Sequence, residues 1–188
     1  MFSQSTRRTN DTMFRMNIRP PPPQPPLPIP VVRDTGGDKK KMIWGEPTWW
    51  FLHTVAHKVV DFPKVRSGLL NIIYQTCVNL PCPVCAKHAK TYLDGINFNT
   101  IQTKEDLKRV LFVFHNVVNE RKGVPLFPAD ELDAKYSTAN TRNIFNNFIR
   151  HFQDRNRSPG LIADDLFRAK LAHQFVGWFN ANGSYFLP

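Results

Sequence analysis

The sequence predicts an all-α protein, and three observations support this fold class. From Trp44 onward, apolar residues recur at helical spacing. No strand-length alternation bounded by hairpin turns interrupts that pattern. Four helix-length segments are joined by short connections, which is the arrangement that a helical bundle needs. The chain has 188 residues, of which 41% are hydrophobic and 12% aromatic, so it can bury one core of ordinary size.

The residues before Trp44 differ in composition from the rest of the chain. Proline occupies eight of the eleven positions from Pro20 to Pro30. Because proline fixes φ and lacks an N–H donor, this stretch predicts an extended polyproline II spacer. We expect residues 1–43 to form a disordered basic and proline-rich tail. Two alternatives are a mitochondrial transit peptide, since the first eighteen residues are rich in arginine, and a proline-rich ligand for an aromatic-lined groove.

The first two predicted helices lie between Trp44 and the first cysteines of the chain. Thr48 is a candidate N-cap for a helix that runs to about Val60, and Pro63 closes that segment. A second apolar helix begins at about Lys64.

The next two helices have clearer end signals. The third begins at the Cys82/Cys85 pair and stops at Gly95, a typical C-terminal residue. The fourth begins after Thr103, which is followed three residues later by Asp106 rather than by the Glu of a full capping box. Gly123 ends this helix.

Two further apolar stripes follow Tyr136. Ile144, Phe148 and Phe152 repeat every four residues, and a similar stripe begins near Leu166. These stripes are too apolar for a tail, so they should pack on the bundle or on a partner. We therefore divide the rest of the chain into a core domain over 44–140 and a helical C-terminal extension over 141–188.

Charge and hydropathy limit the function classes. The formal net charge of +10 suggests an acidic partner. However, residues 44–136 hold eleven basic and nine acidic residues, and no nucleic-acid-binding motif occurs, so we expect no nucleic-acid partner. No run of eighteen apolar residues occurs, so no transmembrane segment is expected, and the N-terminus has no secretory h-region.

Two of the three cysteines form the motif Pro81-Cys82-Pro83-Val84-Cys85 at a predicted helix start. Free N–H groups and the helix dipole stabilise a thiolate at this position, and the i, i+3 spacing brings the two sulfurs within bonding distance. The motif thus predicts a redox-active disulfide. A zinc site with Cys82, Cys85 and His88 is the alternative, its fourth ligand being Cys77 or a distant histidine. In its apolar setting, Cys77 is otherwise expected to be a small buried residue.

Two helices present ring and amide side chains at helical spacing. Trp49, His53 and His57 recur at i, i+4 and i+8 on the first helix, and His115 and Asn119 share a face of the fourth. Such groups can simply satisfy one another in a core. They can also hold a large planar ligand with polar edges between facing helices.

Three blocks of the sequence together resemble the FAD-linked sulfhydryl oxidases of the Erv/ALR family. The blocks are Trp49-Trp50-Phe51-Leu52-His53-Thr54, the cysteine motif, and Phe114-His115-Asn116-Val117-Val118-Asn119-Glu120-Arg121. The resemblance covers about Trp44 to Tyr136. It implies a four-helix bundle with a short fifth helix and FAD at its mouth, commonly as a homodimer. It also implies oxidation of thiols to disulfides with O₂ as acceptor and H₂O₂ as product.

The resemblance implies a role for each matching residue. Cys85 would lie next to the flavin ring, and Cys82 would exchange with the substrate. No metal is expected. The implied FAD contacts are Trp49, His53, His57, His115, Asn116, Val118, Asn119, Lys122 and Tyr136.

The chain also departs from the family pattern. Phe112 and Ala129 stand where many members have a structural disulfide, and Val124 replaces a lysine that contacts phosphate. The chain has no second cysteine pair, so electrons should come directly from a thiol-containing protein or a thioredoxin-like donor, or through a shuttle on another chain. Short viral oxidases often lack such cysteines, so we expect an intracellular location, in an infected cell or a virion, with mitochondria as the alternative. The alternative function is a zinc-binding or basic interaction module.

Overall fold

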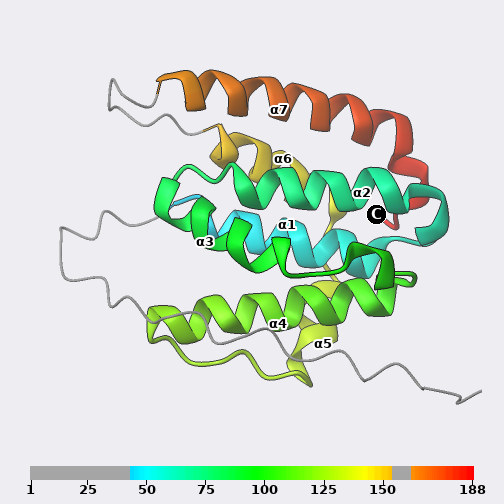
Figure 1. The fold of residues 1–188 in the computed structure, drawn as a ribbon. Coiled ribbons are helices and arrows are strands. Elements are labelled where there is room, and N and C mark those ends of the chain that lie inside the picture. The colour runs from blue at the N-terminus through cyan, green and yellow to red at the C-terminus, as the bar shows by residue number, and fades with distance from the viewer. Residues whose placement is uncertain (1–42, 154–161) are drawn as a thin grey trace, which may run out of the picture.

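The computed structural model describes residues 43–153 and 162–188 (Figure 1). The predicted tail lies outside the described residues except for Ile43. The described chain is helical and contains no strand, only an isolated bridge between Val59 and Phe186. The all-α prediction is therefore confirmed. The helices are α1 (Gly45–Lys58), α2 (Phe62–Val78), α3 (Pro83–Asp94), α4 (Lys104–Lys122), α5 (Glu131–Ser137), α6 (Thr141–Phe152) and α7 (Ile162–Asn182), with 3-10 turns at Phe98–Thr100 and Gly183–Tyr185.

Helix α1 begins earlier than the sequence analysis predicts. Thr48 is not its N-cap: it lies inside the first turn, where its hydroxyl donates a hydrogen bond of 2.8 Å to the Trp44 carbonyl. The prediction is wrong because Pro47 also fits the first turn, where a missing N–H costs no hydrogen bond. The helix can therefore start at Gly45.

Helix α2 begins before Pro63 and not after it. Asp61 is the N-cap, and its carboxylate accepts a hydrogen bond of 3.2 Å from the Lys64 N–H. Pro63 therefore opens α2 in its first turn, whereas we expected it to close the preceding segment.

Both ends of α4 lie where the sequence predicts them, and the capping box at its N-terminus is complete. The Thr103 hydroxyl accepts a hydrogen bond of 3.1 Å from the Asp106 N–H, and the Asp106 carboxylate accepts one of 3.0 Å from the Thr103 N–H. An aspartate can thus close the reciprocal box that we expected to need a glutamate. Gly123 follows in the left-handed conformation, with φ of 65°, and ends the helix.

Helix α1 lies at the centre of the molecule (Figure 1), where it packs against α4, α5 and α6. Residues 51–59 are all buried, so this helix has no solvent face over more than two turns. A helix that is enclosed on all sides fixes the geometry of any group it carries. His53 and His57 belong to this buried stretch.

Helices α6 and α7 close the side of the bundle that lies away from α4. The rings of Phe51 and Phe148 stack with centroids 4.1 Å apart, and Phe145 lies 4.2 Å from Phe179 by the same measure. At the crossing of α2 and α7, the indole of Trp178 occupies the space that a Cβ at Gly68 would need. The two C-terminal apolar stripes therefore pack on the bundle.

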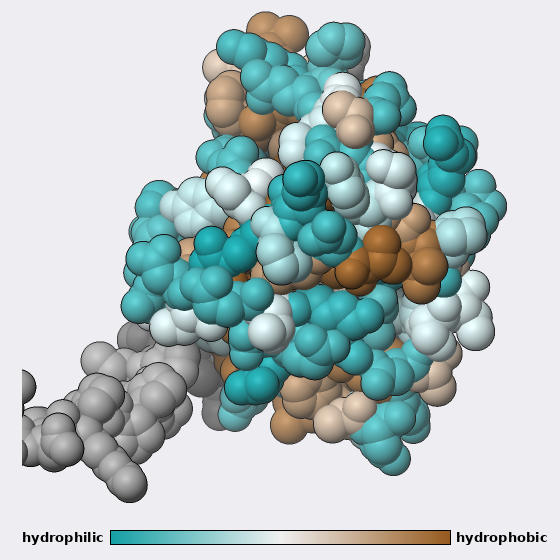
Figure 2. All heavy atoms as spheres, turned by 90° about the vertical axis from the view of Figure 1, so that its right-hand side faces the viewer, coloured by the Kyte–Doolittle hydropathy of each residue, from teal (hydrophilic) through white to brown (hydrophobic). Residues whose placement is uncertain are grey.

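The cysteine pair lies at the end of the molecule where α3 begins. Figure 2 shows the opposite end, whose surface is mainly hydrophilic with separate apolar areas. Within the described residues, no helix is both long enough and apolar enough to cross a membrane.

Candidate redox site

Cys82 and Cys85 form a disulfide at the N-terminus of α3, with their Cα atoms 5.2 Å apart. Cys82 is the N-cap, and its Sγ accepts a hydrogen bond of 3.2 Å from the Cys85 N–H. Pro83 occupies the first turn. The structure thus confirms the placement that the sequence predicts, and it puts both sulfurs at the positive end of the helix dipole.

A pocket opens between α1, α2, α3 and α4 beside this disulfide. Cys85 lies on its wall, whereas Cys82 is not among the lining residues. The wall is mainly apolar and aromatic: it includes Trp49, Leu52, Leu80, Tyr92, Phe114 and Val118. The two sulfurs therefore face different surroundings, since one borders a pocket and the other does not.

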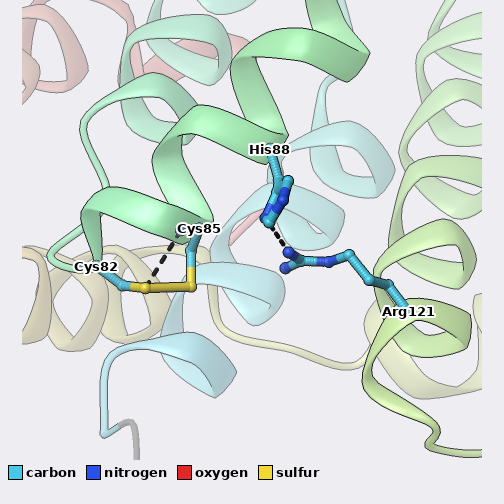
Figure 3. The surroundings of a disulfide bond; sticks show 4 residues. All are labelled: Cys82, Cys85, His88 and Arg121. Atoms are coloured by element: carbon cyan, nitrogen blue, oxygen red, sulfur yellow. Dashed lines mark hydrogen bonds between the residues drawn. A yellow bond between two sulfur atoms is a disulfide. The ribbon is translucent and has the colours of Figure 1, made fainter. Parts of the chain in front are cut away.

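The basic side chains of the pocket wall come from α3 and α4. His88, Arg121 and Lys122 line it. Arg121 reaches from α4 toward α3 and donates a hydrogen bond to Nδ1 of His88 (Figure 3). Burial, and then the nearby Arg121 charge, lower the pKa of Lys122.

A cluster of stacked rings lies next to the pocket and joins α1, α4 and α5. Trp49 stacks on His115 with centroids 3.9 Å apart and planes at 8°, and His53 stacks on Tyr136 at 4.6 Å. His53 Nε2 lies 3.0 Å from His115 Nδ1. The structure therefore brings together four of the residues that the sequence analysis singled out.

Both histidines of this cluster are uncharged at neutral pH. Burial lowers the pKa of His53 to about 3, with further lowering by the neighbouring His115 and His57. Burial also lowers the pKa of His115 to about 4, with a further contribution from Lys135. His53 Nδ1 is buried without a hydrogen-bond partner. One shared proton thus links the two rings, and one polar atom of His53 is left unsatisfied.

His57 belongs to a different network. Its Nδ1 lies 2.8 Å from the His53 carbonyl oxygen, and its Nε2 lies 2.8 Å from Oδ1 of Asp133 on α5. His57 is thus held at both ring nitrogens, by the backbone of its own helix and by a carboxylate of α5. Lys108 of α4 also reaches Asp133, at 2.5 Å. Asp133 is a site residue that the sequence does not reveal, because its partner is 76 positions away.

The two asparagines of α4 hold the connection between α4 and α5. Asn116 Oδ1 accepts a hydrogen bond of 2.8 Å from the Phe127 N–H, and Asn116 Nδ2 donates one of 3.0 Å to the Phe127 carbonyl. Asn119 Nδ2 lies 3.4 Å from Asn116 Oδ1. The amide of Asn116 is therefore engaged with backbone, and the ordered connection keeps α5 near the ring cluster.

Cys77 lines the same pocket but is a buried thiol. Burial raises its pKa to about 12. A thiol with this pKa is almost entirely protonated at neutral pH and is a poor nucleophile.

Comparisons with known proteins agree with this site. The Erv1 / Alr family model matches residues 46–137. A putative FAD-linked sulfhydryl oxidase (096R) of Invertebrate iridescent virus 3 is 32% identical over 97 residues, which cover 50% of this chain and 66% of that protein. The FAD-linked sulfhydryl oxidase of African swine fever virus (isolate Pig/Kenya/KEN-50/1950) is 36% identical over 80 residues, covering 42% and 66% respectively.

A plant protein gives a similar match. The FAD-linked sulfhydryl oxidase ERV1 of Oryza sativa subsp. japonica is 31% identical over 96 residues, which cover 49% of this chain and 48% of that protein. The chain thus spans between about half and two thirds of the length of these relatives. No solved structure was found to match it. The matched segment carries α1 to α5 with the cysteine pair and the ring cluster, and by these features the chain belongs to the Erv1 / Alr family.

Proposed function

We propose that this protein is an FAD-dependent thiol oxidase. It would form disulfide bonds in protein or dithiol substrates, with O₂ as the acceptor and H₂O₂ as the product. The observation that carries the proposal is the position of Cys85 on the wall of a ring-lined pocket, while its disulfide partner Cys82 lies outside that wall. The relatives named above are FAD-linked sulfhydryl oxidases, which supports both the cofactor and the thiol chemistry.

The chemistry of the pocket suits a flavin. Its aromatic and aliphatic walls match a flat ring system, and Lys122 offers positive charge for phosphate groups. His53 Nδ1 next to it has an unused hydrogen-bonding position. The enclosed volume is about 60 Å³, so flavin binding must move side chains of the wall apart. Bound FAD supplies a two-electron acceptor that can react with O₂.

We assign the proposed cofactor contacts by their places in the structure. Trp49, Val118 and Lys122 line the pocket and would touch the cofactor directly. The ring cluster of His53, His115 and Tyr136 would form a flat uncharged boundary beside it. We propose that the remaining three residues act mainly by holding α5 and its connection in position: His57, Asn116 and Asn119.

The cysteine pair would take two electrons from a dithiol. A substrate thiolate attacks Sγ of Cys82, the sulfur–sulfur bond breaks, and the electron pair moves to Sγ of Cys85 as a thiolate. A second substrate thiol then displaces Cys82, which leaves a substrate disulfide and a reduced Cys82/Cys85 pair. With three cysteines in the sequence, this pair is the one available to exchange, because the third thiol is buried.

The donor and the assembly follow from the same proposal. We propose that a thiol-containing protein or a thioredoxin-like donor delivers its electrons to Cys82 directly, or through a shuttle pair on another chain. We also propose a homodimer, as the family resemblance implies. Viral relatives favour a location in an infected cell or a virion, with mitochondria as the alternative.

The visible spectrum of the purified protein tests this function. We expect a yellow protein that consumes O₂ with dithiothreitol. Cys85→Ser should keep the flavin absorbance and lose turnover, whereas the control Cys77→Ala should keep both. A colourless protein with stoichiometric zinc would contradict the proposal in favour of the zinc site. Steeply salt-dependent binding of polyanions by a colourless protein would favour the interaction module.

A further inference from the structure

The pocket wall around Cys85 carries positive charge and no carboxylate within the described residues. Helix α4 contributes Arg121 and Lys122, and α3 contributes His88 and Tyr92. From α2 the wall takes Cys77, and from α1 it takes no titratable side chain. Burial raises the pKa of both Cys77 and Tyr92, so neither group adds negative charge at neutral pH.

His88 holds Arg121 at this wall. Nδ1 of His88 is the contact for the Arg121 guanidinium, which can only donate. Nδ1 of His88 is therefore the acceptor in this hydrogen bond. His88 follows Cys85 by three residues on α3, so the two lie on the same side of the helix. Figure 3 shows Cys85, His88 and Arg121 grouped between α3 and α4.

We propose that Arg121, positioned by His88, stabilises the thiolate that forms on Cys85 when the Cys82–Cys85 disulfide opens. The inference deepens the proposed function and rests on it for the direction of electron flow. In the step concerned, the bond from the incoming substrate sulfur to Cys82 Sγ forms, and the bond between the two cysteine sulfurs breaks. The departing electron pair stays on Cys85, whose new negative charge lies on the same pocket wall as Arg121.

This arrangement decides which sulfur leaves. A thiol of lower pKa is the better leaving group in thiol–disulfide exchange. The N-terminus of α3 favours negative charge on both sulfurs, and the Cys85 N–H donates to Sγ of Cys82. Arg121 lies on the pocket wall with Cys85 and not with Cys82, so its charge is the one that favours Cys85 as the leaving group. Attack is therefore directed to Cys82, and the released thiolate appears on the pocket side of the pair, where the cofactor is proposed to bind.

The experiment measures the Cys85 thiolate without using oxidase turnover. In full-length Cys82→Ser protein, the alkylation rate of Cys85 by iodoacetamide is followed against pH by peptide mass spectrometry. The buried Cys77 peptide serves as an internal control in the same sample. Adding Arg121→Gln should raise the midpoint of the pH profile by about one unit and slow alkylation at pH 7 about tenfold.

Three further variants separate charge from structure. Arg121→Lys keeps a cation and should leave the alkylation rate close to that of the parent. His88→Leu removes the acceptor that positions the guanidinium and should slow alkylation by about threefold, less than loss of the charge itself. Arg109→Gln is the matched control, since it removes an arginine of the same helix that does not line the pocket and pairs with Asp106, at 3.5 Å, and it should change nothing.

The outcomes are distinct. If Arg121→Gln behaves like Arg109→Gln, the inference is overturned. Loss of flavin absorbance with an unchanged alkylation profile would also overturn it, because Arg121 would then serve the cofactor alone. A colourless parent protein whose Cys85 profile still depends on Arg121 would sink the oxidase function and support this inference. If Arg121→Gln does not fold, the pair Arg121→Lys and His88→Leu decides in the same assay: the inference requires the first to be faster than the second.

Discussion

His57 on the central helix α1 and Asp133 on the short helix α5 are joined by a contact of 2.8 Å between Nε2 and Oδ1. His57 is buried, whereas the Asp133 side chain is 71% exposed. Lys108 of α4 shares the same carboxylate oxygen. One aspartate thus connects three helices at the edge of the ring cluster.

Asp133→Ala should lower the free energy of unfolding by about 1 kcal/mol, which lies below the range for fully buried charged hydrogen bonds because Asp133 is largely exposed. For a chain of this size, the melting temperature should fall by roughly 2–4 °C. Asp130→Ala is the control, since Asp130 makes no side-chain cap hydrogen bond. Equal melting temperatures for the two variants, measured by circular dichroism, would show that the contact does not stabilise the fold.

The same aspartate predicts a dependence on pH. Its hydrogen bond to Lys108, and then that to His57, lower the pKa of Asp133 below its ordinary value. A lowered carboxyl pKa gives stability that is present above the unfolded pKa of about 4 and is lost as the pH falls below it. The difference in stability between the wild type and Asp133→Ala should therefore shrink below pH 4. A difference that stays constant down to pH 2 would contradict this origin.

The two neutral histidines predict a second dependence on pH. Burial lowers the pKa of His53 to about 3 and that of His115 to about 4. Below about pH 6.5 both histidines are therefore protonated in the unfolded chain while they stay neutral in the folded protein. The free energy of unfolding should fall with decreasing pH in this range, by about 1.4 kcal/mol per unit for each histidine. We would measure the free energy of unfolding by urea titration between pH 4.5 and 6.5. In His115→Gln, this free energy should depend on pH less steeply than in the wild type, by about 1.4 kcal/mol per pH unit. His173→Gln, an exposed change on α7, should keep the parent slope.

The crossing of α2 and α7 leaves no room for a side chain at Gly68. A Cβ at this position would overlap the Trp178 indole, so Gly68→Ala should destabilise the protein by about 1–3 kcal/mol through overpacking. Gly177→Ala is the matched control: a Cβ there meets nothing within 4 Å, and alanine is the better helix former by about 1 kcal/mol. The midpoint of chemical denaturation should therefore fall for Gly68→Ala and rise for Gly177→Ala. If both midpoints rise, α7 must move aside at this crossing to make room for the added methyl group.

Cysteine burial predicts how many thiols react in the reduced protein. Cys77 is 2% exposed and has a pKa of about 12, whereas the other two cysteines are partly exposed at the start of α3. Native reduced protein should therefore take up two equivalents of N-ethylmaleimide quickly, and the third only in denaturant. Rapid modification of three thiols without denaturant would place Cys77 in an open region.

Much of the fold was predictable because its signals are local. The helical spacing of apolar residues locates the helices, and the pair Thr103/Asp106 marks the start of α4 correctly. The errors concern helix starts at prolines. Pro47 and Pro63 both occupy first turns, and a proline can either open one helix or close another, so the sequence leaves its role open.

The candidate site was predictable to the extent that it depends on spacing within one helix. The i, i+4 pattern of Trp49 and His53 places both rings on one side of α1, and the structure brings them to His115. Contacts between helices carry no such signal. The pairs His57/Asp133 and His88/Arg121 join residues 76 and 33 positions apart, and they depend on how the helices pack.

The stacking of Phe148 of α6 on Phe51 of α1 should keep the two parts of the chain associated after proteolytic cleavage between α5 and α6. The link between α5 and α6 includes Thr138 and Asn140, both exposed and accessible to a protease. A cut there would divide the segment that resembles the family from α6 and α7. The two fragments would remain bound through the rings of Phe51, Phe145 and Phe148, and the cleavage would become visible only under denaturing conditions.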